Sequence, residues 1–365
     1  MTLKTSDLLP FFKGKSPLLD VRAPVEFLAG HIPGAVNLPI LNDDERAQVG
    51  TLYKQKGQEA AIQLGEKLVS GSVKDQRVRV WKDFFAKNPR SLVYCFRGGL
   101  RSRTAQAWLA ESGVEVPRLE GGYKAARQMF LATFQKAVDE RPFLLISGPT
   151  GGGKSHLLRT AQNFMSAIDL EKRAQHRGSA FGFESEPQPQ QAQFENLLAQ
   201  DFLRISETGA ASKETPLLFE DESRLIGQNV IPESLFVKMR ASPIVWVDEP
   251  LDQRVENIFA DYITNTAIGQ GDESQGLALF QRYEKSLLSI QRRLGGLKTQ
   301  ELMADLQFSH ADYLEKKNLD SNRIWIKKLL VDYYDPLYLN SLEKRNPQIL
   351  FKGTSKEILL FFQTL

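Results

Sequence analysis

The sequence predicts two α/β domains built on parallel sheets, the second of which ends in a helical part. Short apolar runs alternate with amphipathic stretches, and polar residues directly follow several of these runs. Such runs are typical of buried parallel strands, beyond whose carboxyl ends ligands bind. Two glycine-rich loops, at residues 95–102 and 148–155, follow two of the runs, and 365 residues suffice for two domains.

Five apolar runs are predicted to be buried strands, at residues 16–21, 91–95, 142–147, 216–219 and 243–247. A helical stretch from Ala125 to about Glu140 lies between the two loops and ends before Pro142, because proline disfavours helix at the preceding residue. We therefore divide the chain into domains 1–135 and 136–365. From about Asp252 onward the apolar spacing is mostly helical.

The composition is that of an ordinary globular protein, with 42% hydrophobic and 25% charged residues. A single cysteine excludes an internal disulfide and a cysteine metal cluster, and the four histidines show no metal-ligand spacing. No apolar run is long enough for a bilayer span or a signal sequence. We therefore expect a cytoplasmic protein with no membrane partner.

The net charge of +3 is unevenly distributed, since residues 1–140 hold 21 Lys and Arg against 15 Asp and Glu. The most basic stretch runs from Lys74 to Arg90 and contains Trp81. It permits a polyanionic partner on the first domain. A solvated helix face is the preferred interpretation.

The first glycine-rich loop reads Cys95-Phe96-Arg97-Gly98-Gly99-Leu100-Arg101-Ser102. Its glycines allow successive backbone N–H groups to face one anion, and Arg101 can bring a guanidinium to the same place. Both effects favour the thiolate, which is the nucleophilic form of cysteine. We predict that Cys95 is reactive, although a lone cysteine is more often an inert buried residue.

The second loop, Gly148-Pro149-Thr150-Gly151-Gly152-Gly153-Lys154-Ser155, matches the phosphate-loop pattern G-x-x-x-x-G-K-[ST]. A predicted strand precedes it and a predicted helix follows, which is the context that the pattern requires. Backbone N–H groups and the positive helix end bind phosphate, Lys154 adds a charge, and Ser155 can hold Mg²⁺. The loop predicts a phosphorylated ligand with Mg²⁺, and it leaves hydrolysis open.

Acidic residues follow two later strands and are candidates for Mg²⁺ support. Glu220, Asp221 and Glu222 follow the run at 216–219, and Asp248-Glu249 follows the run at 243–247. We prefer the first group because Arg224 lies beside it and can also face a phosphate. The alternative for both groups is a role as exposed turn residues.

The first 130 residues carry motifs that resemble rhodanese domains. Residues 18–22 (LLDVR), 26–27 (EF) and 30–39 (GHIPGAVNLP) resemble their N-terminal signature, and residues 119–126 (LEGGYKAA) resemble the segment after their active-site loop. The resemblance implies a rhodanese-like fold in which His31 is structural.

The chain departs from the rhodanese pattern in two ways. Residues 41–90 form an insertion that looks helical, and Arg101 follows Cys95 by six positions instead of five. The resulting C-x5-R spacing is shared with cysteine phosphatases, and the wider loop suits a tetrahedral anion such as phosphate or selenophosphate.

A rhodanese-like domain followed by a P-loop NTPase-like domain resembles the tRNA 2-selenouridine synthases. Residues 176–182 (HRGSAFG) and 220–227 (EDESRLIG) support the resemblance, which covers nearly the whole chain. It implies a transferase that acts on 2-thiouridine at the wobble position of certain tRNAs. Geranyl diphosphate would alkylate the sulfur, and selenophosphate would then replace the S-geranyl group with selenium.

The resemblance also implies the site residues and partners. Cys95 would hold selenophosphate or carry selenium, with Arg97 and Arg101 as anion ligands. The diphosphate ligands would be Gly148, Gly151, Gly152, Gly153, Lys154 and Ser155, and the other substrate or Mg²⁺ contacts would be His176, Arg177, Glu220, Asp221 and Arg224. We expect Mg²⁺ as cofactor, geranyl diphosphate and selenophosphate as co-substrates, the tRNA anticodon loop as partner, and a monomeric chain.

Two other functions stay open on the sequence. The C-x5-R spacing permits a rhodanese-fold cysteine phosphatase, or a sulfurtransferase, coupled to a nucleotide-binding domain. Tyr94 precedes the cysteine where many phosphatases have histidine, which counts against the phosphatase. The third possibility is a binding module in which the first domain is only a scaffold, and the intact Cys95 and Lys154 count against it.

Overall fold

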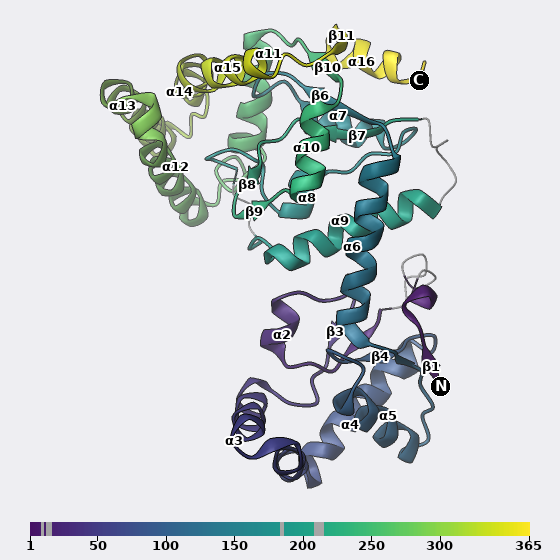
Figure 1. Cartoon of the computed structure of the whole chain (residues 1–365). Coiled ribbons are helices and arrows are strands. Elements are labelled where there is room, and N and C mark those ends of the chain that lie inside the picture. The colour runs from purple at the N-terminus through teal and green to yellow at the C-terminus, as the bar shows by residue number, and fades with distance from the viewer. Residues whose placement is uncertain (9–10, 12–16, 183–185, 208–214) are drawn as a thin grey trace. The chain divides into compact units, whose positions relative to one another are not determined.

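A computed structural model describes residues 1–8, 11, 17–182, 186–207 and 215–365 (Figure 1). The contacts group the chain into two compact units. Unit 1 comprises Met1–Asp139 and Pro189–Gly209, and unit 2 comprises Glu140–Gln188 and Ala210–Leu365. No helix in the described parts of the chain combines the length and the apolar character needed to cross a bilayer.

Unit 1 is built on a five-stranded parallel sheet of order β1-β5-β4-β2-β3. Every strand is two residues long, so the predicted runs at 16–21 and 91–95 contain strands but exceed them; Ser16 lies outside the described residues. The strands are β1 (Thr2–Leu3), β2 (Leu19–Asp20), β3 (Val36–Asn37), β4 (Val93–Tyr94) and β5 (Arg118–Leu119). The helices are η1 (Thr5–Leu8), α2 (Pro24–Leu28), α3 (Asp43–Leu68), α4 (Gly71–Lys87), α5 (Leu100–Glu111), α6 (Gly122–Glu140) and α9 (Gln191–Glu207).

The predicted insertion at 41–90 consists of helices α3 and α4. Asn42 caps α3 by accepting from the Glu45 N–H at 2.8 Å, while the Glu45 carboxylate accepts from the Asn42 N–H at 2.8 Å. Gly57, at φ +82°, interrupts the helical backbone inside α3. Helix α4 buries Trp81 and Phe85 in the same core as Leu19 and Val93 of the sheet, so the insertion packs as part of unit 1.

Helix α9 belongs to unit 1 by its contacts, although it follows the phosphate loop in sequence. Phe202 of α9 packs edge-on against Phe134 of α6, with ring centroids 5.4 Å apart. Arg127 of α6 donates to Asn196 at 2.8 Å and pairs with Glu195. A division at residue 135 therefore leaves one helix of the first unit in the second half of the sequence.

Unit 2 contains a four-stranded parallel sheet of order β11-β10-β6-β7. The three strands predicted in this unit are present. The sheet strands are β6 (Phe143–Ser147), β7 (Leu217–Glu220), β10 (Ile244–Val247) and β11 (Ile349–Gly353), and β8 (Leu225–Ile226) pairs antiparallel with β9 (Asn229–Val230). Helices α7 (Lys154–Ala161), α8 (Leu170–Ala174), α10 (Glu233–Ala241) and α16 (Ser355–Phe362) accompany them. Leu157 and Leu158 of α7 and Ile358 of α16 are buried in one core with the central strands β6 and β10.

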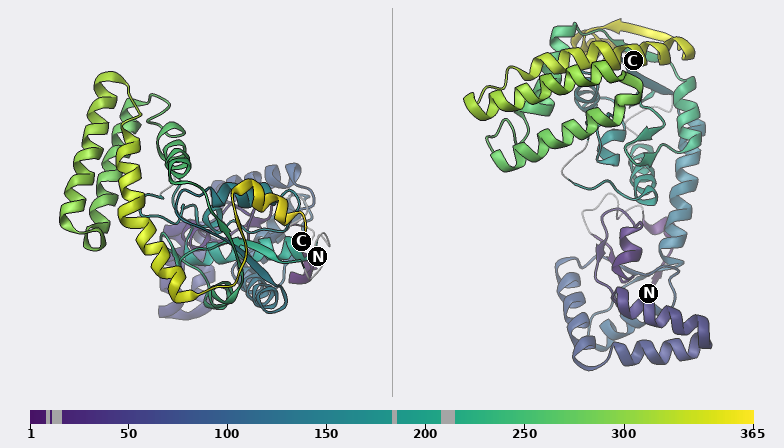
Figure 2. Two further views of the ribbon diagram at one scale, coloured as in Figure 1. Left: turned by 90° about the horizontal axis from the view of Figure 1, so that it is seen from above. Right: turned by 90° about the vertical axis from the view of Figure 1, so that its left-hand side faces the viewer.

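The predicted helical part forms a second core within unit 2. Its helices are α11 (Leu251–Phe259), η2 (Ala260–Thr264), α12 (Glu273–Leu294), α13 (Gly296–Lys316), α14 (Asn322–Leu329), η3 (Leu330–Tyr334) and α15 (Asp335–Arg345). Helices α12 and α13 form an antiparallel pair (Figure 2). Both η2 and η3 are single π-helical turns, a feature often found at functional sites.

Candidate functional site

The phosphate loop connects the end of β6 at Ser147 to the start of α7 at Lys154. Only glycine fits at position 148, where φ is +145° and a Cβ atom would lie 2.7 Å from the Val247 carbonyl oxygen. Within the described chain, the N–H groups of Gly151, Gly153, Lys154 and Ser155 donate to no protein acceptor. They point from a loop and a helix N-terminus, which is a ready-made anion site.

Lys154 and Tyr338 complete the loop. The Lys154 ammonium donates to the Gly148 carbonyl at 2.8 Å and lies 5.6 Å from the centroid of the Tyr338 ring. The Tyr338 hydroxyl accepts from the Gly148 N–H at 2.7 Å and lies 2.6 Å from the Ser147 hydroxyl. The position of the ammonium over the loop is thus set before any anion binds.

Three carboxylates lie beside the loop, and each offers an oxygen within 4.8 Å of the others: Glu171, Glu220 and Glu222. The Ser155 hydroxyl donates to Glu171 at 3.0 Å. One Glu220 oxygen is buried and has no hydrogen-bond partner in the described structure. Burial raises the pKa of all three, to about 7 for Glu171, well above its usual range for Glu220, and to about 8 for Glu222, with the neighbouring carboxylates adding to the effect.

This carboxylate cluster fits a hard divalent cation. Mg²⁺ takes oxygen ligands and is usually held by one or two carboxylates together with substrate phosphates. A buried carboxylate oxygen without a donor costs free energy unless a proton or a metal satisfies it. Ser155 and Glu220 are therefore the residues best placed to hold Mg²⁺ next to the phosphate loop.

The loop and the cluster face one cavity of about 470 Å³ in unit 2. Its cationic lining residues are Lys154, Arg159, Arg177, Arg240 and Arg345. Burial and the charge of Arg345 lower the pKa of Arg240, which indicates cations held together without full compensation. Such a cavity suits a ligand with more than one negative charge.

An apolar recess adjoins this cavity and shares five lining residues with it. The recess is lined by Thr150, Ser179, Phe181, Ile258, Tyr262, Trp325, Ile326, Leu329, Leu330 and Tyr334. The indole N–H of Trp325 is already bonded to Asn322 at 2.9 Å. No amide, carboxylate or cationic side chain is among these lining residues, and their polar groups are the hydroxyls of Thr150, Ser179, Tyr262 and Tyr334 and the Trp325 indole N–H. It measures about 20 Å³, which is room for one or two small groups such as methyls.

The cysteine loop lies in unit 1, between β4 and the first turn of α5. Cys95 is 3% exposed, and its sulfur lies 3.2 Å from the Ser102 hydroxyl. The N–H groups of residues 96–99 donate to no protein acceptor within the described chain. Gly122 packs directly behind the loop, where a Cβ atom would lie 2.2 Å from the Cys95 carbonyl oxygen. The backbone therefore offers the anion cradle that the glycines predicted.

The two loop arginines differ in their surroundings. Arg101 forms a two-point ion pair with Glu26, at 2.5 and 3.1 Å. Partial burial raises the pKa of the Glu26 carboxyl, but the pairing with Arg101 outweighs this and the net pKa is lowered. Arg97 is exposed and lies near the Phe96 ring, with its guanidinium carbon 5.8 Å from the centroid. An anion at Cys95 would thus meet a guanidinium whose orientation Glu26 already determines.

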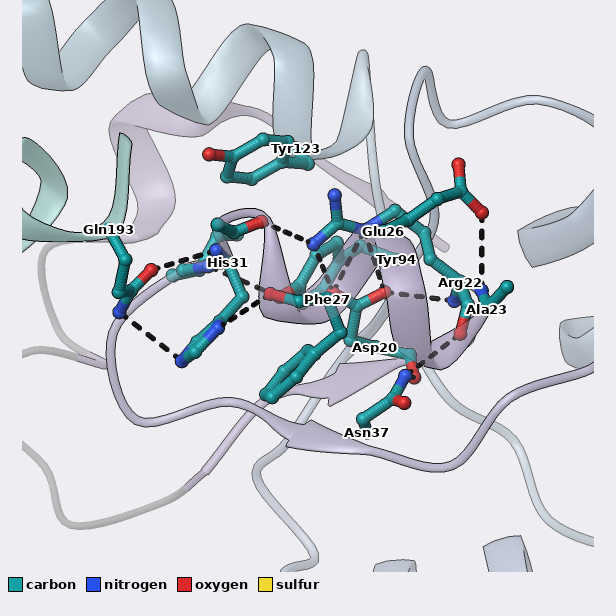
Figure 3. A network of polar contacts seen from close by, with 12 residues as sticks. Asp20, Arg22, Ala23, Glu26, Phe27, His31, Asn37, Tyr94, Tyr123 and Gln193 are labelled. Carbon is teal, nitrogen blue, oxygen red and sulfur yellow. Dashed lines mark hydrogen bonds and ion pairs between the residues drawn. The ribbon is translucent and has the colours of Figure 1, made fainter. Parts of the chain in front are cut away.

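A buried ion pair supports the strand next to the loop (Figure 3). Asp20 accepts from the Arg22 guanidinium at 2.7 Å, and the same nitrogen donates to the Gly30 carbonyl at 2.8 Å. His31 lies 3.0 Å from the Phe27 carbonyl through Nδ1 and 3.2 Å from the Gln193 amide through Nε2. Its contacts join the turn to α9, in agreement with the structural role predicted for His31.

The structure brings most of the predicted unit 2 residues to the cavity, and leaves some out. Lys154, Ser155, Glu220, Asp221 and Arg177 line it. Asp221 is held by Arg345 at 2.6 Å and by the Ser147 hydroxyl at 2.6 Å, and it is not part of the carboxylate cluster. Four predicted residues, Gly148, Gly152, Arg224 and His176, are not among the described residues that line the cavity. The N–H groups of Gly148 and Gly152 donate to the Tyr338 hydroxyl and the Pro149 carbonyl. Arg224 pairs with Glu233 at 2.5 Å with 58% of its side chain exposed. The alternative acids, Asp248 and Glu249, bind Lys352 and the Ser355 N–H.

Sequence reasoning missed Glu171, Tyr262, Tyr338 and Arg345. Glu171 had a usable signal, because it follows the short apolar pair Ala167-Ile168, which runs parallel to β7 at one bridge. The other three come from the helical part, whose side chains reach the cavity only through tertiary packing.

Comparison with known proteins agrees with this geometry. The family described as the tRNA 2-selenouridine synthase AAA domain matches residues 141–365, and the rhodanese-like domain family matches residues 7–128. A protein of Bdellovibrio bacteriovorus named tRNA 2-selenouridine synthase is 51% identical over 100% of this chain and 98% of its own length. The chain belongs to the tRNA 2-selenouridine synthase family.

A second relative matches over nearly its full length. The protein of Nitrosomonas europaea with that name is 46% identical over 98% of this chain and 97% of its own length. The solved N-terminal domain of a Clostridium difficile 630 protein is 36% identical over 36% of this chain and 99% of its own length, with a TM-score of 0.33. Family membership makes the chain an enzyme of tRNA modification.

Proposed function

We propose that the protein converts wobble 2-thiouridine in tRNA to 2-selenouridine in two steps, with geranyl diphosphate and then selenophosphate as co-substrates. The observation that carries the first step is the composition of the unit 2 cavity. Free N–H groups and cations line one part of it, and an apolar, aromatic recess adjoins it. A diphosphate bound at the loop could direct an isoprenoid chain toward this recess, which has room for the end of the chain only.

In the first step the thiouridine sulfur attacks C1 of geranyl diphosphate. The C1–O bond breaks, its electron pair leaves with diphosphate, and the proton on N3 of the base is released. Lys154 and the free N–H groups of the loop stabilise the charge that develops on the leaving diphosphate. Bound Mg²⁺, held by Ser155 and Glu220, would neutralise further phosphate charge.

In the second step the selenium of selenophosphate attacks C2 of the base and geranylthiol leaves. Water then cleaves the selenium–phosphorus bond, giving 2-selenouridine and phosphate. Selenium in selenophosphate is already fully reduced, so carrying it on Cys95 as a perselenide would require an oxidant. We therefore favour the cysteine loop as the holder of the selenophosphate anion, with Cys95 and the free N–H groups of the loop beside the reacting phosphorus group.

Mass spectrometry of wobble nucleosides tests both steps. Wild-type protein should produce 2-selenouridine from thiolated tRNA, geranyl diphosphate and selenophosphate. Cys95→Ala should accumulate the S-geranyl nucleoside, because only the second step uses the cysteine. Lys154→Ala should raise the KM for geranyl diphosphate strongly, whereas Lys172→Ala, which removes an exposed lysine of α8, should not.

Two results would contradict the proposal. Selenouridine formation by Cys95→Ala at the wild-type rate would remove the cysteine from the mechanism. Unchanged geranylation by Lys154→Ala would remove the phosphate loop. Rapid turnover of an aryl phosphate by the wild-type protein would instead favour the cysteine phosphatase alternative.

A further inference from the structure

Helix α12 carries a row of basic side chains on one exposed face. Arg282, Lys285, Arg292 and Arg293 are all exposed, and Ser289 lies between them. The spacing of three and four residues places these positions along one side of a helix. From Arg282 to Arg293 the row extends about 16 Å at the helical rise of about 1.5 Å per residue. We call these four cations the α12 basic row.

Three cations of the row have no acidic counterpart in the described chain. Lys285, Arg292 and Arg293 form no ion pair there, and Glu284 on the same helix is within hydrogen-bond distance of the Gln307 amide. On the neighbouring helices, Asp305 pairs with Lys328, Asp312 with Lys316, and Asp332 with Lys298. These three acids are therefore paired with cations outside the row.

The basic stretch predicted in unit 1 behaves differently. Lys74 pairs with Glu111 at 3.1 Å and Arg77 pairs with Glu45 at 2.7 Å. Lys82 donates to the Ser112 carbonyl at 3.2 Å, and Trp81 is buried. Three of the six cations between Lys74 and Arg90 are thus bound to groups within the protein, whereas only Arg282 of the α12 basic row has such an interaction.

The opposite face of α12 supports the cavity. Tyr283 is buried, and its hydroxyl donates to the Tyr262 carbonyl at 2.5 Å. Tyr262 lines both the cavity and the apolar recess. A polyanion bound on the outer face would thus lie on the same helix that braces the prenyl-binding part of the site.

We propose that the α12 basic row binds the phosphate backbone of the tRNA substrate. A row of cations about 16 Å long, of which Lys285, Arg292 and Arg293 form no ion pair within the described chain, matches a polyanion with regularly spaced charges. Arg292 and Arg293 also lie in the last helical turn, where cations stabilise the helix dipole. That effect does not explain Lys285, which lies in the middle of the helix. The proposal rests on tRNA as the substrate of the proposed function, and its test needs neither co-substrate.

The test is tRNA binding by the full chain as a function of salt concentration. Arg292→Gln/Arg293→Gln removes two contacts, so the slope of log affinity against log salt should fall by roughly 1.4 to 1.8. At about 0.1 M salt each lost phosphate contact corresponds to a roughly five- to eightfold weaker affinity. Adding Lys285→Gln to this double variant should lower both the tRNA affinity and the slope of log affinity against log salt further.

The matched control is Lys316→Gln/Lys327→Gln, which removes the same charge from cations paired with Asp312 and Asp252. Equal affinity loss and equal slope change in the two double variants would overturn the proposal. Weaker binding with an unchanged slope would also overturn it, because phosphate contacts must release counterions. The wild-type protein could also bind tRNA through the α12 basic row and yet form no geranylated tRNA. That result would support the proposed tRNA-binding surface and reject only the proposed chemistry.

Discussion

The carboxylate cluster should make the metal-free protein lose stability as pH rises, and replacing Glu220 with Gln tests the cause. Oxygens of Glu171, Glu220 and Glu222 lie within 4.8 Å of one another. At that separation and an effective dielectric constant near 20, Coulomb's law gives a repulsion of about 3.5 kcal/mol for each ionised pair. Ionising the whole cluster is therefore costly without a cation.

The direction of the pH dependence of stability follows from the number of protons that the folded and unfolded protein bind. Burial raises the pKa of Glu171 to about 7 and that of Glu222 to about 8, whereas a glutamate in the unfolded chain titrates near 4.3. Between about pH 4.5 and pH 8 the folded protein thus binds more protons than the unfolded chain. Its free energy of unfolding falls with rising pH across this window. A bound divalent cation replaces the protons and should restore stability most at the upper end.

Glu220→Gln removes two of the three repulsive pairs, so it should stabilise the metal-free protein near pH 8. Proton uptake already relieves part of the repulsion in the wild type, which limits the gain to about 1–3 kcal/mol. For a domain of this size that corresponds to a rise in Tm of about 2–12 °C. Near pH 5.5 the two proteins should differ little. Millimolar Mg²⁺ should raise the wild-type Tm near pH 8 and raise that of Glu220→Gln much less.

Thermal unfolding followed by circular dichroism, with and without Mg²⁺ at both pH values, measures these differences. Glu233→Gln is the control, because it removes an exposed carboxylate paired with Arg224. A lower Tm for metal-free Glu220→Gln near pH 8, or a wild-type Tm that rises from pH 5.5 to pH 8 without metal, would refute the reasoning.

Two further predictions concern the apolar recess and the cysteine loop. Leu329→Ala should widen the recess, so the ratio of kcat/KM for farnesyl diphosphate to kcat/KM for geranyl diphosphate should rise. The substitution should also lower the free energy of unfolding by about 2–5 kcal/mol, because Leu329 is buried. An unchanged ratio in steady-state assays would exclude the recess as the prenyl site. Gly122→Ala should displace the cysteine loop, because its Cβ would lie 2.2 Å from the Cys95 carbonyl oxygen and the glycine φ is +57°. Selenium incorporation should then fall while geranylation continues, and nucleoside analysis showing equal losses of both would contradict this.

The features that the sequence predicted well are local. The phosphate loop, the cysteine loop and the end of α6 before Pro142 depend on residues adjacent in the chain, and the structure contains each of them. Glu220 was identified because it follows a buried strand. Glu171 was missed because its relation to Ser155 depends on how α8 packs beside the loop.

Features that depend on contacts between residues far apart in the chain could not be predicted from the sequence. The pairing of Asp221 with Arg345 spans 124 positions, so nothing near Asp221 indicates that its charge is already compensated. Arg224 lies two residues after Glu222 in the sequence, yet its side chain pairs with Glu233 and does not line the cavity. The assignment of α9 to unit 1 likewise depends on contacts such as Phe134 with Phe202.

The placement of α9 determines when unit 1 can be completed during translation. Residues 1–139 leave the ribosome first, but the helix that covers Phe134 and bonds to His31 follows only after the phosphate loop has been synthesised. A nascent chain that ends before residue 190 therefore exposes part of the apolar surface of α6. Unit 1, which contains Cys95, therefore cannot complete its fold until α9 has been synthesised, although the residues before and after α9 in the sequence belong to unit 2.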